Sequence, residues 1–254
     1  MSALIKYPVI RSLVQSPFLD IIGALLVFSI SYYLSFHQTI YFEGKIQFNI
    51  SFDELSSYVK RGAYPLGIFS ILGAVFSMLA TRFTGKQKNL GNVLGAVTTV
   101  NSGANDFLFG NASAIITYPL TFFIFTFAIK RWAGGEKIRK IDSLYYIIIF
   151  ISILVGYALV FLGASIFGGR NELNFLVIVS LTFGISLGAN ICNALKYNQT
   201  WISWIVYNGF QLVKNSILGN FANVIKYIFY LFNAVITQID WKFNGDINPE
   251  PSVV

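Results

Sequence analysis

The chain has 254 residues, of which 55% are hydrophobic and only 11% are charged, and its mean hydropathy is +0.64. A typical soluble domain is about 25% charged, so this composition excludes an ordinary soluble domain and indicates a polytopic α-helical membrane protein. The net charge of +7 comes from basic residues scattered over the loops between apolar runs, which is typical of cytoplasmic loops and indicates no nucleic-acid partner. The single cysteine, Cys192, and single histidine, His37, exclude an intrachain disulfide, a Cys-based or His-based metal site and a Ser-His-Asp triad within the membrane.

The first 62 residues are expected to hold one membrane span and the longest polar connection. Met1–Gln15 is short and mildly basic, which predicts a segment lying at the membrane interface. Phe18–Phe36 is apolar, contains Asp20 and is followed by no small-x-small cleavage site, so we expect an uncleaved helix rather than a signal peptide. The charged residues of His37–Gly62 predict a solvated loop.

Seven further runs are each long enough to cross a bilayer as a helix. They are approximately Tyr64–Phe83, Gly91–Phe109, Ser113–Ile129, Leu144–Phe167, Leu173–Leu195, Thr200–Ile217 and Phe221–Ile239, which makes about eight transmembrane helices with the first. The third and seventh spans are the least apolar, and we expect them to lie inside the bundle. Basic residues gather in the connections between spans two and three and between spans four and five, so the positive-inside rule places both termini in the cytoplasm.

An internal repeat relates two parts of the chain at a constant offset of 109 residues. It aligns Leu66–Trp132 with Phe175–Trp241 without a gap, and it pairs the Gly110-Asn111 and Gly219-Asn220 turns. Each unit contains three spans, with Leu144–Phe167 between them, so the two units enter the membrane in the same direction. The predicted organisation is an N-terminal segment (1–62), a three-helix repeat (63–132), a linker helix (133–172), a second, parallel repeat (173–241) and a tail (242–254).

A polar stripe runs along one face of the seventh span. Its members follow helical spacing and are Trp201, Trp204, Asn208, Gln211 and Asn215. Two indoles above three amides suit a flat polar molecule, because the indoles stack on a ring and the amides satisfy its hydroxyls and carbonyls. The equivalent positions in the first repeat are Asn92, Gly95, Thr99, Ser102 and Asp106. We therefore predict an asymmetric cavity between the two helices; the alternative is ordinary polar packing between helices.

Other polar residues leave two interpretations open. Asn223 and Tyr227 share a face of the last span, and they could either contact a ligand or bond to a neighbouring helix. Asp106, Lys214 and Lys226 are expected near helix ends, with the lysine side chains reaching towards the membrane surface.

Two further tryptophans lie beside basic residues at span ends. Trp132 and Trp241 are therefore expected to be anchors at the membrane interface. No pair of carboxylates lies in the middle of a span, and intramembrane His, Asp and Glu are few. These shortages disfavour ion-driven transport and a membrane enzyme, and no cofactor is expected.

The second repeat carries a motif that resembles the PnuC family of vitamin transporters. The motif is the WxxW pair Trp201 and Trp204 with Asn208, followed by GNFANVIKYIFYLFNA. The pattern DFLFGN…ITYPLTF within Asp106–Phe122 is similar to the same family, as is the plan of three, one and three spans. The resemblance covers Tyr64–Trp241, and the family in turn resembles the SWEET sugar-transporter plan with an additional N-terminal span.

The resemblance implies uptake of nicotinamide riboside by facilitated diffusion, with a cytoplasmic kinase trapping the substrate for NAD synthesis. Trp201 and Trp204 match the WxxW motif, Asn208 lies one turn beyond, and Gln211, Asn223 and Tyr227 match less distinctive positions. With the stripe, the expected substrate-binding residues are Trp201, Trp204, Asn208, Gln211, Asn215, Asn223, Tyr227, Thr99 and Ser102. Sister groups carry thiamine or riboflavin, and a membrane receptor with a static pocket is another alternative. The resemblance also implies a homotrimer in the cell membrane, which is the inner membrane in a Gram-negative cell.

Overall fold

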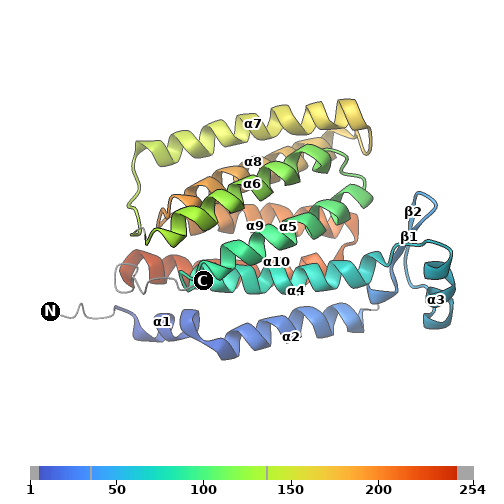
Figure 1. The fold of residues 1–254 in the computed structure, drawn as a ribbon, viewed down its shortest axis with the longest axis horizontal. Helices are drawn as coiled ribbons and strands as arrows, with labels where there is room; N and C mark the ends of the chain where they lie inside the picture. The colour runs from blue at the N-terminus through green and yellow to red at the C-terminus, as the bar shows by residue number, and fades with distance from the viewer. Residues whose placement is uncertain (1–5, 35, 136, 245–254) are drawn as a thin grey trace.

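The computed structural model describes residues 6–34, 36–135 and 137–244, so most of the expected tail at 242–254 lies outside the described residues. Within them, the chain forms ten α-helices, one 3-10 helix and one β-hairpin (Figure 1). The elements are α1 (Pro8–Gln15), α2 (Pro17–Tyr33), η1 (Phe36–Gln38), β1 (Ile40–Phe42), β2 (Lys45–Gln47), α3 (Phe52–Lys60), α4 (Leu66–Gly85), α5 (Leu90–Leu108), α6 (Ala114–Ala133), α7 (Ser143–Phe167), α8 (Leu173–Ala194), α9 (Thr200–Leu218) and α10 (Phe221–Asn244).

Eight of these helices, α2 and α4 to α10, coincide in position with the eight predicted spans. In the part of the chain that the structure describes, five are long and apolar enough to cross a membrane: α4, α6, α7, α8 and α10. The pair α1 and α2, bent by 57° at their junction, is a sixth candidate. The two helices expected to be least apolar, α5 and α9, do not reach this level. The fold is therefore an all-α membrane fold with five or six candidate spans.

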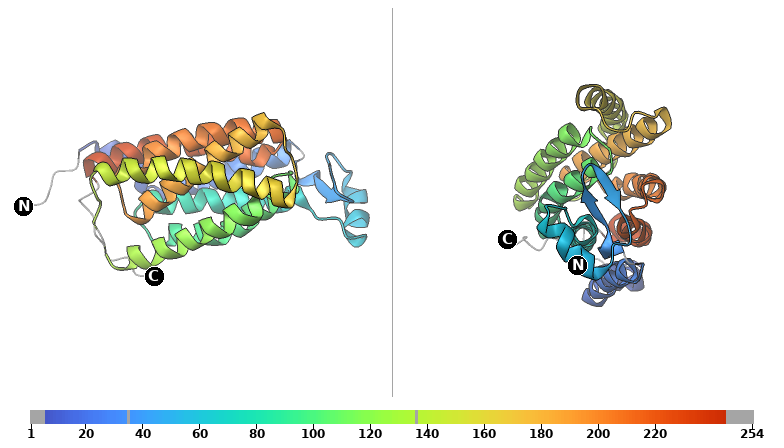
Figure 2. Two further views of the ribbon diagram at one scale, coloured as in Figure 1. Left: turned by 90° about the horizontal axis from the view of Figure 1, so that it is seen from above. Right: turned by 90° about the vertical axis from the view of Figure 1, so that its right-hand side faces the viewer.

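The long helices run side by side along the long axis of the molecule (Figures 1 and 2). The β-hairpin and α3 lie at one end, called here the hairpin end. At the other end, called the terminal end, α1 begins and α10 finishes, and the Lys6 backbone N–H donates to Asn244 Oδ1 at 2.8 Å. The helix α2 packs on α4 and α10 at one flank, and α7 packs on α8 at the other.

The six remaining helices make two equivalent sets of contacts. In one set α4 packs on α5 and α5 on α6, and in the other α8 packs on α9 and α9 on α10. Across the sets, α4 contacts α10 and α8 contacts α6, which are again equivalent pairs. The ends of the six helices match within two residues at an offset of 109. These are the equivalences that the predicted repeat requires.

The turns that follow α5 and α9 have the same backbone geometry. Gly110 and Gly219 both adopt positive φ angles, of 94° and 70°, which favour glycine because it lacks a Cβ. One residue later, the Asn111 N–H donates to the Asp106 carbonyl and the Asn220 N–H to the Asn215 carbonyl, both at 3.0 Å. The paired Gly-Asn turns of the sequence therefore close their helices in the same way.

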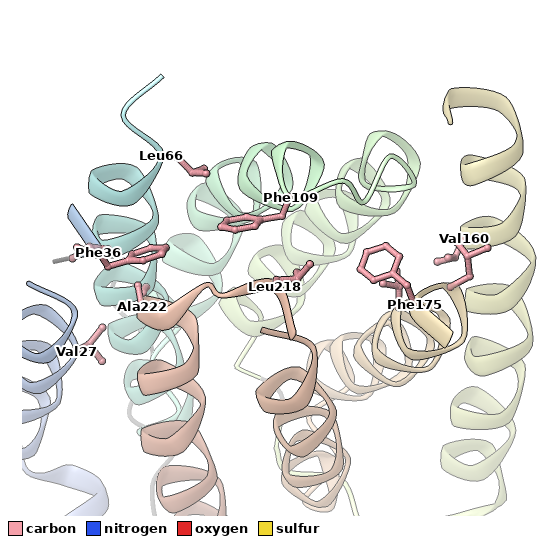
Figure 3. Close-up of a cluster of buried hydrophobic side chains, with 12 residues drawn as sticks. Val27, Phe36, Leu66, Phe109, Val160, Phe175, Leu218 and Ala222 are labelled. Carbon is pink, nitrogen blue, oxygen red and sulfur yellow. The ribbon is translucent and has the colours of Figure 1, made fainter. Parts of the chain in front are cut away.

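A hydrophobic cluster joins the helices at the hairpin end (Figure 3). Its labelled members come from α2, η1, α4, α7, α8, α9, α10 and the turn after α5, and they are Val27, Phe36, Leu66, Phe109, Val160, Phe175, Leu218 and Ala222. On the α7 flank, a Cβ added to Gly156 would lie 2.6 Å from the Gly184 Cα, so only glycine permits this approach of α7 to α8.

The segment His37–Gly62 is solvated over most of its length, as predicted, but the prediction that it is a loop is wrong. This segment contains the antiparallel β1–β2 hairpin and α3, and its Ile40 and Leu55 form a small core with Ala63, the residue that follows the segment. Glu43 and Gly44 connect the strands with φ angles of 49° and 78°, which suit the right-handed twist of a two-residue hairpin. Such short elements have too little periodicity to be recognised in a charged connection.

Candidate functional site

A polar cavity of about 140 Å³ lies among the six helices of the two equivalent sets. Its lining comes from α4, α5, α6, α8, α9 and α10 and the turn after α5, and in the described chain α1, α2 and α7 contribute nothing to it. The volume is about ten times what one water requires, so the cavity can hold a small molecule. The two equivalent sets therefore meet around one site.

Seven of the nine expected substrate-binding residues line this cavity. They are Trp201, Trp204, Asn208 and Gln211 on α9, Thr99 and Ser102 on α5, and Tyr227 on α10. Both polar stripes thus contribute to the same cavity, and its tryptophans come from the second set alone.

The other two expected residues, Asn215 and Asn223, are not part of the lining. The Asn215 side chain is buried, and its Nδ2 donates to the Gln211 carbonyl at 2.8 Å and to Gln211 Oε1 at 3.0 Å. It therefore positions Gln211 instead of facing the cavity. Asn223 is half-buried in the first turn of α10, where its backbone N–H donates to Asn220 Oδ1 at 3.3 Å.

At the terminal end, three indoles form one buried cluster. Trp241 contacts Trp201 edge-on at a centroid distance of 5.6 Å and Trp132 at 6.2 Å. Trp132 Nε1 donates to the Asn193 carbonyl at 2.9 Å, and Trp241 Nε1 donates to the Gly85 carbonyl at 2.8 Å. The prediction that Trp132 and Trp241 are interfacial anchors is therefore wrong, because both are buried and each ties the end of one set to the other.

Four buried polar atoms in this half of the cavity have no hydrogen-bond partner. They are Trp201 Nε1 and the Oδ1 atoms of Asn190, Asn193 and Asn208. Buried polar atoms normally have partners, so unpaired ones on residues that line a cavity indicate positions where a ligand can bond. One donor and three acceptors suit a ligand that presents an amide and hydroxyl groups. The half-buried Trp204, edge-on to Tyr207 at 5.2 Å, adds an aromatic surface.

Tyrosines and one amide occupy the middle of the cavity. Gln211 Nε2 donates to the Tyr207 hydroxyl at 2.9 Å, and the Tyr207 and Tyr227 hydroxyls lie 3.3 Å apart. The Tyr230 hydroxyl lies 2.6 Å from Ser77 Oγ on α4. The first two contacts lie within α9 and between α9 and α10, and the third joins α10 to the first set of helices.

The hairpin-end half of the cavity is charged. Asp106 Oδ2 accepts from Asn111 Nδ2 at 3.1 Å, from the Tyr118 hydroxyl at 2.9 Å and from Lys214 Nζ at 2.7 Å. Lys226, only 3% exposed, places its Nζ 4.4 Å from the centre of the Tyr227 ring. The prediction that these lysines reach the membrane surface is wrong, because both are buried and line the cavity.

The sequence contained a signal for part of this cluster. Asp106 occupies the position in the first stripe that Asn215 occupies in the second, so it belongs to a cavity-facing row. Lys226 lies one turn from Tyr230 on the face that also carries Tyr227, yet its charge suggested a helix end. The pairing of Asp106 with Lys214 joins residues 108 positions apart and has no local signature.

An apolar helical bundle around a polar cavity of this size defines a membrane protein with a buried site for a small molecule. The two ends of the site differ: one presents indoles and amide oxygens, and the other presents two ammonium groups and one carboxylate. Among the described residues, no three His, Cys, Asp or Glu side chains form a group that could hold a metal ion.

The chain belongs to the nicotinamide mononucleotide transporter family, whose model matches residues 67–243. It is similar in fold to the crystal structure of the vitamin B3 transporter PnuC, with a TM-score of 0.62 at 16% sequence identity. That match covers 89% of this chain and 91% of the other. No curated protein sequence matches the chain.

Proposed function

We propose that this chain takes up nicotinamide riboside by facilitated diffusion and that cytoplasmic phosphorylation traps the substrate for NAD synthesis. The observation that carries the proposal is the terminal-end half of the cavity, where tryptophans lie beside unpaired amide oxygens in a member of a transporter family. The substrate-binding residues proposed are the seven that line the cavity, with Asn215 positioning Gln211 behind them.

The chemistry of the ligand matches this half of the cavity. A pyridinium ring over an indole face gains about 0.5–2 kcal/mol from the attraction between the cation and the ring electrons. The carboxamide NH₂ can donate to the unpaired Oδ1 atoms of Asn190, Asn193 or Asn208, and the Trp201 N–H can donate to the carboxamide or ribose oxygen. Each such bond would satisfy a buried atom that has no partner in the described structure.

Transport would follow from the two equivalent sets of helices. We propose eight spans, one at the N-terminus and two parallel three-helix repeats joined by α7, with both termini in the cytoplasm. Rocking of one repeat against the other would expose the cavity to each side of the membrane in turn. The protein would act as a homotrimer in the cell membrane, the inner one in a Gram-negative cell.

Binding of nicotinamide riboside to the purified protein, followed by tryptophan fluorescence, tests the site. We expect saturable quenching for the wild type and at least about tenfold weaker binding for Trp204→Ala, because stacking and the cation–ring attraction are lost together. Tyr146→Ala is a matched control, since Tyr146 is 63% exposed on α7 and far from the lining. Unchanged affinity in Trp204→Ala would overturn the site assignment.

Two measurements separate this function from its alternatives. Uptake into proteoliposomes distinguishes a transporter from a receptor, because a receptor binds the ligand without moving it across the bilayer. Competition with thiamine and riboflavin distinguishes the vitamin; thiamine is the more demanding competitor because it is also a cationic aromatic. A tighter response to either compound than to nicotinamide riboside would reassign the substrate.

A further inference from the structure

The hairpin-end half of the cavity contains a cation that has no counter-charge of its own. Lys226 makes no hydrogen bond or ion pair with any residue that the structure describes, although it is only 3% exposed. Its Nζ lies 4.4 Å from the centre of the Tyr227 ring and 5.6 Å from that of Tyr230. A charged group buried in a membrane bundle is costly unless something neutralises it.

One oxygen of the one nearby carboxylate is already committed. Asp106 Oδ2 accepts three hydrogen bonds, one of them from the Lys214 ammonium at 2.7 Å. Asp106, Lys214 and Lys226 are the only acidic or basic residues in the described lining, so two cations share one anion and the cavity carries a net charge of +1. The two aromatic rings that lie beside Lys226, those of Tyr227 and Tyr230, are neutral.

We propose that Lys226 forms an anion-binding subsite at the end of the cavity opposite the tryptophans. The occupant is either an anionic group of the transported molecule, such as a phosphoryl group, or a small inorganic anion that enters with a cationic ligand. Both sources share one chemistry, a negative charge that neutralises the ammonium group and accepts its hydrogen bonds. This inference rests on the proposed function because it concerns the same cavity.

The separation of the two ends suits a ligand with a ring and a distant charge. Trp204 and Lys214 lie ten residues apart on α9, which corresponds to about 15 Å along the helix axis. A cationic ring bound at the indole end therefore lies far from Lys226. An anion bound beside Lys226 removes the repulsion that the net positive charge of the cavity would otherwise exert on that ring.

Calorimetric titration of the purified protein can test this subsite and distinguish its two sources. One arm compares nicotinamide mononucleotide with nicotinamide riboside, which differ by the phosphoryl group. The other titrates nicotinamide riboside in sodium chloride, sodium phosphate and sodium gluconate at equal ionic strength. In the wild type we expect about tenfold tighter binding in at least one arm, the effect of one charge-assisted hydrogen bond. The arm that responds identifies the source of the anion.

The variants separate a charge effect from a structural one. Lys226→Met should abolish the anion preference, and Lys226→Arg should retain it because the charge remains. Lys45→Met, a lysine exposed on β2, is the matched control and should behave like the wild type. Lys214→Met gives an independent test: it frees Asp106 to neutralise Lys226, so the preference should disappear although Lys226 is intact.

Two results would overturn the subsite. One is binding of nicotinamide riboside that neither the phosphoryl group nor the inorganic anion strengthens; the other is an anion preference that persists in Lys226→Met. Failure of the proposed function has a different outcome, since neither nicotinamide compound would then bind in any buffer.

Discussion

Two buried clusters of charge lie towards opposite ends of the bundle, and they differ in whether their bonding is complete. At the terminal end, Arg82 Nε donates to Asp20 Oδ1 at 2.7 Å and Nη1 donates to Asn233 Oδ1 at 2.7 Å. Its Nη2 donates to the carbonyls of Leu13, Val14 and Ser16, at the junction of α1 and α2. Lys86 also pairs with Asp20, so every nitrogen of Arg82 has an acceptor and the carboxylate has two cations.

The cluster at Asp106 also contains two cations and one carboxylate, but it stays open because one of its cations, Lys226, has no acceptor among the described residues. Three donors bond to one oxygen of its carboxylate, and Lys226 is not one of them. Arg82 does not line the cavity, whereas Asp106, Lys214 and Lys226 all do. The comparison indicates that the closed cluster fastens α1 and α2 to the bundle, while the open one faces a ligand.

Breaking the closed cluster should have the largest effect on stability. Arg82→Ala leaves Asp20 with Lys86 alone and removes one hydrogen bond from each of three carbonyls and one amide oxygen, so we expect a loss of about 3–5 kcal/mol in the free energy of unfolding. Equilibrium unfolding in mixed detergent micelles measures the loss. Arg170→Ala is the matched control, because Arg170 pairs with Glu172 at the surface, where such pairs contribute about 1 kcal/mol or less. Equal losses in the two variants would contradict the assignment of a structural role to the Arg82 cluster.

A double-mutant cycle in the open cluster sharpens the comparison. Lys214→Met should cost less than about 3 kcal/mol, because Lys226 lies within electrostatic reach of Asp106 and can replace the lost partner. Lys226→Met should be neutral or stabilising, since it removes a buried charge that has no partner of its own. The double variant leaves Asp106 without a cation and should cost about 3–5 kcal/mol, more than the two single losses together. Strictly additive losses would show that Lys226 does not interact with Asp106.

The Trp132 and Trp241 indoles, like the Arg82 side chain, have an acceptor for every nitrogen but carry no charge, so their disruption should cost less. Trp132→Phe and Trp241→Phe each remove an N–H that donates to a buried carbonyl, of Asn193 and Gly85 respectively. Because each bond ties the end of one set of helices to the other, with acceptors one position apart at the offset of 109, we expect similar losses of about 1–3 kcal/mol. Unfolding of each variant in mixed micelles measures them. A loss in only one variant would show that the two sets of helices are not energetically equivalent.

The long helices could be predicted because each is an apolar run of sufficient length, a property of neighbouring residues. Even the two weak runs, now α5 and α9, were placed correctly, since polar stripes at helical spacing mark them. The stripes also supplied six of the seven expected substrate-binding residues that line the cavity, and the seventh is Tyr227 on α10. The pattern could not show whether a residue at the end of a span is buried by neighbouring helices. Trp132 and Trp241 stand beside basic residues, as interfacial anchors do, but both are buried in the bundle.

The charged half of the site was missed for a related reason. Lysines near the ends of apolar runs usually reach the membrane surface, and only the fold shows that α5, α9 and α10 bring Asp106, Lys214 and Lys226 together. The hairpin was missed because strands of three residues, Ile40–Phe42 and Lys45–Gln47, are too short for alternation to stand out.

The ion pair between Arg139 and Asp142 is exposed, unlike the two buried clusters. Water competes there for the hydrogen bonds of both side chains, so the pair is expected to contribute less to stability. Asp142 caps α7 and lies 40% exposed beside Arg139. The Tyr197 hydroxyl donates to Asp142 Oδ1 at 2.7 Å, and this bond is the main reason why the pKa of Asp142 is lowered, with smaller contributions from Arg139 and the Tyr145 N–H. Burial and the same bond raise the pKa of Tyr197 to about 12, so the tyrosine remains a donor at neutral and acidic pH.

The smallest predicted effect follows from this pair. Because the pKa of Asp142 is lower in the folded protein than the unfolded value of about 3.9, its contribution to stability is present above about pH 4. The contribution is lost as the pH falls through the folded pKa. Thermal unfolding between pH 3 and pH 7 should therefore show a weaker acid dependence for Asp142→Asn than for the wild type. If Asp142→Asn instead lowered stability equally at every pH, the helix cap at α7 would depend on the shape of the side chain and not on its charge.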